Sequence, residues 1–165
     1  MRQCGLLAVA FFIVSCNPGC SVSSAGSKVP AVLLEVLEHG EDFTLFSLDP
    51  AVDTNATNPF HDWRIIGSTP IPEAATRSRV VSSLIRGIDE NDGTVAACFN
   101  PRHGLRVTHA GVVHDLVICF ECMQVRWYSG STSSELIRIT PSPQRTFDAT
   151  LTGAGVELAP AAAGH

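Results

Sequence analysis

The chain has 165 residues, which is enough for one domain with a hydrophobic core and too few for two ordinary domains. Hydrophobic residues make up 45% of the chain and charged residues 16%, and this balance excludes an intrinsically disordered protein. The formal net charge of -5 gives no electrostatic reason to expect nucleic acid or an anionic membrane surface as a partner.

Residues 1–15 are typical of a secretory signal peptide. Arg2 supplies the positive start, and an apolar core follows at residues 5–14. This core is too short to cross a bilayer, which takes about 20 residues. The sequence Ile-Val-Ser-Cys at residues 13–16 comes next. We therefore expect the signal to be removed close to this point.

The segment at residues 13–16 resembles the lipobox of bacterial lipoproteins, in which a branched apolar residue, a tolerant position and a small residue precede a cysteine. The resemblance implies cleavage before Cys16 and lipidation of its thiol, with acyl chains such as palmitate as the membrane anchor. Cys20 fits the pattern less well, because Asn-Pro-Gly precedes it. The alternative is an ordinary secreted protein that is cut nearby.

This N-terminus predicts a location in the cell envelope, with a lipid anchor in a membrane and the domain in the periplasm or outside the cell. By resemblance to enterobacterial sorting, Asn17 after the cysteine favours the outer membrane of a Gram-negative cell. The Gly- and Ser-rich composition predicts a flexible tether over residues 16–29. A single domain is expected over residues 30–165, with a frayed tail from about residue 159.

The periodicity of apolar residues and the turn signals divide the domain into helices and strands. Pro30 and Gly40 bracket the first helix, and Pro72 begins the longest one. The expected helices are 30–39, 72–91 and 142–151, and the expected strands are 43–48, 60–67, 94–99, 105–108, 114–122 and 124–129, with a further edge strand at 156–158. Short connections between the central strands favour antiparallel neighbours. We therefore predict an α+β fold, an antiparallel sheet of five or six strands with two or three helices packed against it.

Residues 98–104 read CFNPRHG and residues 115–122 read DLVICFEC. Together with the upstream SLDP and FHDWRIIGSTPI segments, they resemble a group of uncharacterised bacterial envelope proteins with the recurring pattern CFxPRHG followed by DLxICFEC. The likeness covers roughly residues 43–158. It implies the same kind of domain and the same compartment, and it implies no activity.

Cys98, His103, Cys119 and Cys122 have the side chains of a Cys3His zinc site. A straight strand through residues 117–125 would place Cys119 and Cys122 on opposite faces and about 10 Å apart, so this site needs a break near Glu121. A disulfide between Cys98 and Cys119 across neighbouring strands needs no break. Buried apolar cysteines, a redox-active CxxC and a cysteine nucleophile with His103 are further alternatives.

Strand alternation places Asp115, Val117, Cys119 and Glu121 on one face and predicts that Leu116, Ile118 and Phe120 face the core. A carboxylate among apolar neighbours needs a partner. The candidates for a polar cluster are Arg102, His103, Asp115 and Glu121, with Arg86 as a further cation. Such a cluster is either a structural ion-pair network or a ligand pocket.

The sequence contains no GxxxxGK, GxGxxG, HExxH or GxSxG motif, which disfavours nucleotide enzymes, zincins and serine hydrolases. We therefore expect a non-catalytic envelope lipoprotein that binds an unidentified protein or small molecule or has a structural role. The second hypothesis is a metal- or thiol-dependent protein that uses the cysteines and His103. The third is a hydrolase-like enzyme that uses Arg102, His103 and Glu121.

Overall fold

A computed structural model describes residues 26–52, 55–130 and 134–160. Six strands form one antiparallel sheet in the order β2-β1-β3-β4-β5-β6. The strands are β1 (Glu41–Val52), β2 (Trp63–Pro70), β3 (His103–His109), β4 (Val112–Cys119), β5 (Gln124–Ser129) and β6 (Glu135–Arg138). With the three helices below, this arrangement confirms the predicted α+β fold.

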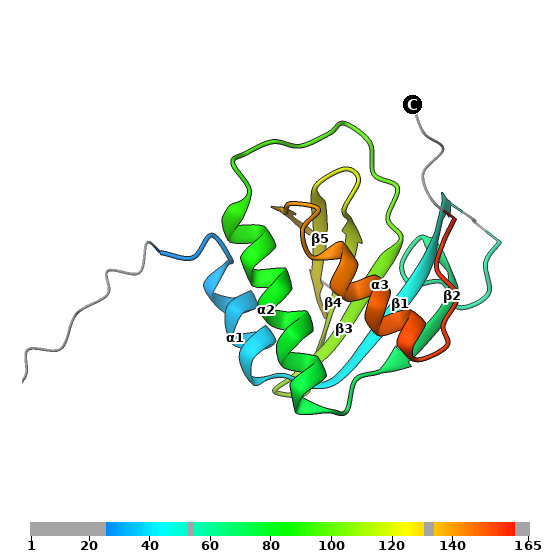
Figure 1. Cartoon of the computed structure of the whole chain (residues 1–165), viewed down its shortest axis with the longest axis horizontal. Coiled ribbons are helices and arrows are strands. Elements are labelled where there is room, and N and C mark those ends of the chain that lie inside the picture. Colours follow the sequence, from blue (N-terminus) through cyan, green and yellow to red (C-terminus); the bar gives the residue numbers. More distant parts are fainter. Residues whose placement is uncertain (1–25, 53–54, 131–133, 161–165) are drawn as a thin grey trace, which may run out of the picture.

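The helices α1 (Ala31–His39), α2 (Ala74–Glu90) and α3 (Gln144–Gly153) all lie on the same face of the sheet (Figure 1). Each turns an apolar stripe toward the strands. In α2 the stripe consists of Val80, Leu84 and Ile88, which follow one another at intervals of four residues and are at most 2% exposed. The helix-facing core continues through the inward residues of the strands, among them Leu45, Leu105, Leu116, Ile118 and Val125.

The opposite face of the sheet carries a second, smaller apolar cluster. Phe46, Leu48 and Val117 contribute to it from the strands, and Phe60 and Trp63 contribute from the connection into β2 and its first residue. Phe60 lies over Gly104 so closely that a Cβ atom at that position would come within 2.7 Å of its ring. The loop before β2 therefore serves as a cover for this face.

A two-residue turn sets the register between β3 and β4. Ala110 and Gly111 both have positive φ, at 50° and 77°, as tight hairpin turns require. Counting outward from the turn, His109 pairs with Val112 and Arg106 pairs with Asp115. The turn thus places the guanidinium and the carboxylate of this last pair side by side on the face opposite the helices.

Three local expectations were wrong, and one strand was missed. Residues 94–99 do not form a strand; they pass beside the turn after β4, where the side chain of Gln124 hydrogen bonds to the carbonyls of Ala96 and Cys98. β4 ends at Cys119 rather than at residue 122, because residues 120–123 form the turn into β5. The sequence signals missed β6, and residues 156–158 contain no strand.

The N-terminal boundary of the packed structure lies slightly earlier than residue 30. The side chain of Ser27 and the backbone of Lys28 donate hydrogen bonds to Asp89, and Val29 is buried. The predicted signal peptide and Cys16 lie outside the described residues. Within the described ranges, no helix has the length and apolar character needed to cross a membrane.

Candidate functional site

A hollow of about 420 Å³ lies where the segment before β3, the turn after β4, α3 and the C-terminal segment meet. We call it the Arg102 hollow. Its walls are lined by polar and apolar side chains from all four regions, namely Asn100, Arg102, His103, Phe120, Glu121, Gln144, Asp148, Leu158 and Ala159. A volume near 400 Å³ suits a small molecule.

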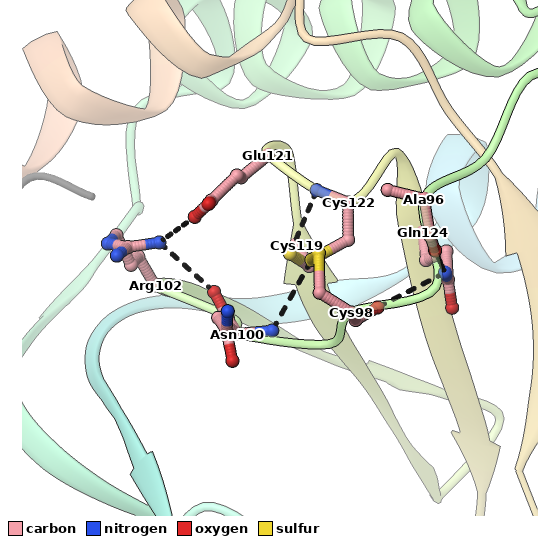
Figure 2. The surroundings of a disulfide bond; sticks show 8 residues. All are labelled: Ala96, Cys98, Asn100, Arg102, Cys119, Glu121, Cys122 and Gln124. Atoms are coloured by element: carbon pink, nitrogen blue, oxygen red, sulfur yellow. Dashed lines mark hydrogen bonds and ion pairs between the residues drawn. A yellow bond between two sulfur atoms is a disulfide. The ribbon is translucent and has the colours of Figure 1, made fainter. Parts of the chain in front are cut away.

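Arg102 joins three parts of the chain at the rim of this hollow. Its Nη1 donates to Glu121 Oε2 at 2.7 Å and to the carbonyl of Asn100 at 3.3 Å (Figure 2). Its Nε donates to the carbonyl of Pro160 at 2.8 Å. The predicted contact between Arg102 and Glu121 is therefore confirmed, and the guanidinium also holds the C-terminal segment in place.

His103 lies deeper than Arg102 and has a different carboxylate partner. Its Nε2 is 2.8 Å from Asp148 Oδ1 of α3, and its side chain is only 4% exposed. Phe120 and Phe147 pack against the imidazole ring edge to face. No local sequence pattern points to Asp148, because helix α3 brings it to His103 from 45 residues away. Three predicted cluster members, Arg102, His103 and Glu121, thus line one hollow.

The fourth predicted member, Asp115, lies elsewhere, on the sheet face opposite the helices. Arg106 donates to both of its carboxylate oxygens at 2.7 and 2.8 Å, and His61 Nε2 is 3.1 Å from Oδ2. The imidazole of His61 stacks on Tyr128 with the ring centroids 3.7 Å apart. Including Asp115 in the cluster was wrong, because Asp115 lies on β4 and faces away from the helices, whereas Glu121 lies beyond the end of β4, in the turn that lines the hollow. We call this group the Asp115 network.

Burial of Asp115 favours its protonated form and would raise its pKa, but the hydrogen bonds from Arg106 and His61 outweigh burial and hold the pKa below its ordinary value. Asp115 therefore stays ionised, and its contact with His61 ties the loop before β2 to the sheet. His61 itself has a positive φ of 56°. These contacts assign the Asp115 network a structural role.

Cys98 and Cys122 form a disulfide with a Cα–Cα distance of 5.6 Å, and Cys119 is a free, buried thiol (Figure 2). The expected pairing of Cys98 with Cys119 was wrong. The turn at residues 120–123 brings Cys122 around to the segment that carries Cys98, where the backbone N–H of Ala96 donates to the carbonyl of Cys122. The break near Glu121 that a zinc site would have needed is present, because β4 ends at Cys119.

The four side chains of the proposed zinc site do not converge. Two of the sulfurs are bonded to each other, and His103 contacts Asp148. Among the residues that the structure describes, no group of three or more His, Cys, Asp or Glu side chains is placed to hold a metal ion. The geometry therefore does not support zinc binding by Cys98, His103, Cys119 and Cys122.

A larger hollow of about 680 Å³ lies between the start of α2, the end of β2 and α3. Arg79 and Arg145 line it, and both are exposed residues. Among the described residues that line it, none is a buried titratable side chain comparable to His103. The Arg102 hollow, with one nearly buried imidazole, the ion pair of Arg102 with Glu121 and the contact of His103 with Asp148, is the better candidate for a specific site.

Comparison of the chain with protein-family models, with curated proteins and with solved structures finds no match.

Proposed function

We propose that this chain is a non-catalytic binding module of the bacterial cell envelope, anchored by lipid on Cys16, and that the Arg102 hollow binds a small organic cation. The observation that carries the proposal is the unequal exposure of the charges in the hollow. The side chains of Glu121 and Asp148 are 34% and 31% exposed, whereas those of Arg102 and His103 are 17% and 4% exposed. A ligand in the hollow therefore meets carboxylate oxygens first.

The hydrogen bonds within the hollow support the same reading. Glu121 uses only Oε2 for its ion pair, and Asp148 uses only Oδ1 for its contact with His103. Oε1 and Oδ2 have no hydrogen-bond partner among the described residues, and each can accept a hydrogen bond from an ammonium group. Phe120 and Leu158 add apolar surface beside these oxygens. This combination suits an amine with a short apolar part.

The amine 2-phenylethylamine is a suitable probe, and 2-phenylethanol is its uncharged control of the same size. At a tenfold excess over Kd, binding stabilises the folded state by about 1.4 kcal/mol. For a domain of this size, we expect the midpoint of thermal unfolding of the mature chain to rise by about 5 °C. The alcohol should give a much smaller rise, because it lacks the charge that the carboxylates select.

Two variants locate the effect. Glu121→Gln should reduce the rise caused by the amine at least several-fold, and Glu35→Gln, on the exposed surface of α1, should leave it unchanged. Equal shifts with the amine and the alcohol, or equal losses in the two variants, would exclude cation binding at the hollow.

The anchor has its own test. We expect the wild-type precursor and the Cys20→Ser variant, expressed in a bacterium, to appear in the membrane fraction with a mass increase from acylation. Cys16→Ser should lack both properties. Retention of the acyl mass in Cys16→Ser would refute the assignment of the anchor to Cys16.

A hydrolytic activity is the second candidate, and the contact between His103 and Asp148 beside Glu121 favours it. The described residues that line the hollow include no Ser, Thr, Cys or Lys, so hydrolysis there would use a water molecule activated by the imidazole or a carboxylate. Turnover of p-nitrophenyl esters by the wild type and its loss in Asp148→Asn would favour this candidate over simple binding. Equal, background rates in both proteins would count against it.

A further inference from the structure

Three sulfur atoms lie together at the end of β4, and the proposed cation site uses none of them. Cys119 is the last residue of β4, Cys122 lies in the turn that follows, and Cys98 belongs to the segment that crosses beside this turn (Figure 2). We call residues 94–100 the strap. Cys98 and Cys122 are bonded, and Cys119 retains its thiol.

Backbone N–H groups donate to the free thiol and to one sulfur of the disulfide. The N–H of Cys122 donates to the Sγ of Cys119 at 3.1 Å, and the N–H of Asn100 donates to the Sγ of Cys122 at 3.4 Å. The first bond closes a four-residue turn over Cys119 and Cys122, the span that a CxxC disulfide bridges. Cys122 therefore has two cysteine neighbours, and only one is its partner in this structure.

We infer that Cys119 is an internal attacking thiol for the Cys98–Cys122 disulfide, so that the bond can move to Cys119–Cys122 and release Cys98 as a free thiol. In this step the Cys119 thiolate attacks Cys122 Sγ. The Cys119–Cys122 bond forms as the Cys98–Cys122 bond breaks. The electron pair leaves with Cys98 Sγ, which takes up one proton to replace the proton that Cys119 lost. Neither an oxidant nor a reductant is consumed.

The surroundings of Cys119 determine when the step is fast. Cys119 is 1% exposed, and burial raises the pKa of its thiol, while the N–H groups of Asn100 and Cys122 oppose that rise. Among the charged groups nearby, Glu121 raises the pKa further and Arg102 lowers it. Because the thiolate is the attacking species, the rate of exchange should rise roughly tenfold per pH unit below this raised pKa.

The released thiol would lie on the more accessible side of the cluster. Cys98 is partly exposed, whereas Cys119 and Cys122 are buried. The strap is otherwise held by hydrogen bonds to Cys122 and Gln124, and by Phe99, whose ring centroid lies 4.0 Å from the Arg126 guanidinium carbon. Exchange would thus replace the covalent hold on the strap by noncovalent contacts and expose a thiol to an external partner.

Peptide mapping separates the two disulfide states. We would use the full chain with Cys4→Ser, Cys16→Ser and Cys20→Ser, which leaves three cysteines. After incubation at pH 6 or pH 9, N-ethylmaleimide traps free thiols, and trypsin then cuts after Arg102 and Arg106. In the observed state the disulfide links two tryptic peptides. In the exchanged state it lies within one peptide, and Cys98 carries the label.

At pH 9 we expect labelled Cys98 and the internal Cys119–Cys122 peptide to increase together, at a rate roughly a thousandfold higher than at pH 6, because the thiolate fraction rises about tenfold with each pH unit below the raised pKa. Cys119→Ala, which keeps an apolar side chain in the core, should abolish labelling of Cys98, and Cys119→Ser serves as the second variant. Near-ultraviolet circular dichroism at both pH values verifies that the protein stays folded. An unbroken cross-link between the two peptides at pH 9, or equal labelling of Cys98 without Cys119, would overturn the inference.

Discussion

The Asp115→Asn substitution keeps the size of the side chain and removes its charge. The wild-type carboxylate receives two hydrogen bonds from Arg106 and one from His61, and its side chain is 9% exposed. An asparagine at this position offers one oxygen acceptor, and its NH2 group would face the N–H donors of Arg106 and His61. Breaking a buried charge pair costs about 3–5 kcal/mol, but the Arg106 side chain is 44% exposed and regains water. We therefore expect a loss of about 2 kcal/mol in the free energy of unfolding.

Urea unfolding at pH 7 measures this loss directly. For a slope of about 2 kcal/mol/M, the midpoint should fall by about 1 M. Asp49→Asn is the matched control, because its ion pair with Arg64 is exposed and should contribute less than about 0.5 kcal/mol. Equal midpoints for wild type and Asp115→Asn would refute the structural role of the Asp115 network.

The pH dependence gives an independent check on the same residue. The folded-state pKa of Asp115 lies below its ordinary value of 3.8, so the folded state binds a proton less readily than the unfolded state. This stabilisation is complete above pH 3.8 and is lost as the pH falls through the lowered folded-state pKa. The difference between wild type and Asp115→Asn should therefore shrink in acid. A constant difference from pH 7 down to pH 2 would contradict this assignment.

Three further changes test other parts of the account. Replacing both Cys98 and Cys122 by alanine removes a disulfide with a sequence separation of 24 and should lower the free energy of unfolding by about 3 kcal/mol in urea titrations. Gly104→Ala places a Cβ 2.7 Å from Phe60 and should cost about 1–3 kcal/mol, measured in the same way. Burial lowers the pKa of His114 below 6.5, an effect that nearby His109 strengthens and Asp115 opposes. Wild-type stability should therefore decline as the pH falls below 6.5, and His114→Phe should remove that decline.

For each of these substitutions, one result would contradict the expected effect on stability. An unchanged urea midpoint in the double alanine variant would mean that the disulfide adds no stability. Gly153→Ala, in α3 with no atom within 4 Å of the added Cβ, should be neutral or stabilising, and an equal loss in Gly104→Ala and Gly153→Ala would exclude a steric cause. An identical decline with acid in wild type and His114→Phe would assign the titration to another group.

The fold could be predicted from the sequence where local signals were strong. The spacing of apolar residues in α2 and the alternation around Leu116, Ile118 and Phe120 correctly predicted which residues form the core between the sheet and the helices. The pairing of Arg106 with Asp115 could also have been predicted, because a two-residue turn at Ala110 and Gly111 determines which residues of β3 and β4 lie opposite each other. The grouping of Asp115 with Glu121 assumes a strand that continues to residue 122, whereas β4 ends at Cys119.

Other features depend on tertiary contacts that no local pattern reports. Residues 94–99 have the composition of a strand, but side-chain amide contacts from Gln124 replace strand pairing there. The disulfide partner of Cys98 depends on where β4 ends, and a shift of the end from residue 122 to Cys119 changes that partner. Asp148 reaches His103 only through the packing of α3 on the sheet.

Cation binding at the Arg102 hollow is tested most directly by a titration of the 15N-labelled mature chain with 2-phenylethylamine, followed by nuclear magnetic resonance. We predict saturable shifts of backbone amides at residues 100, 102–103, 120–121, 144 and 148, and their loss in Glu121→Gln. Shifts centred instead on the amides of Thr69, Ile71, Glu73 and Thr146 at the larger hollow, or no saturable shifts, would contradict cation binding at the Arg102 hollow.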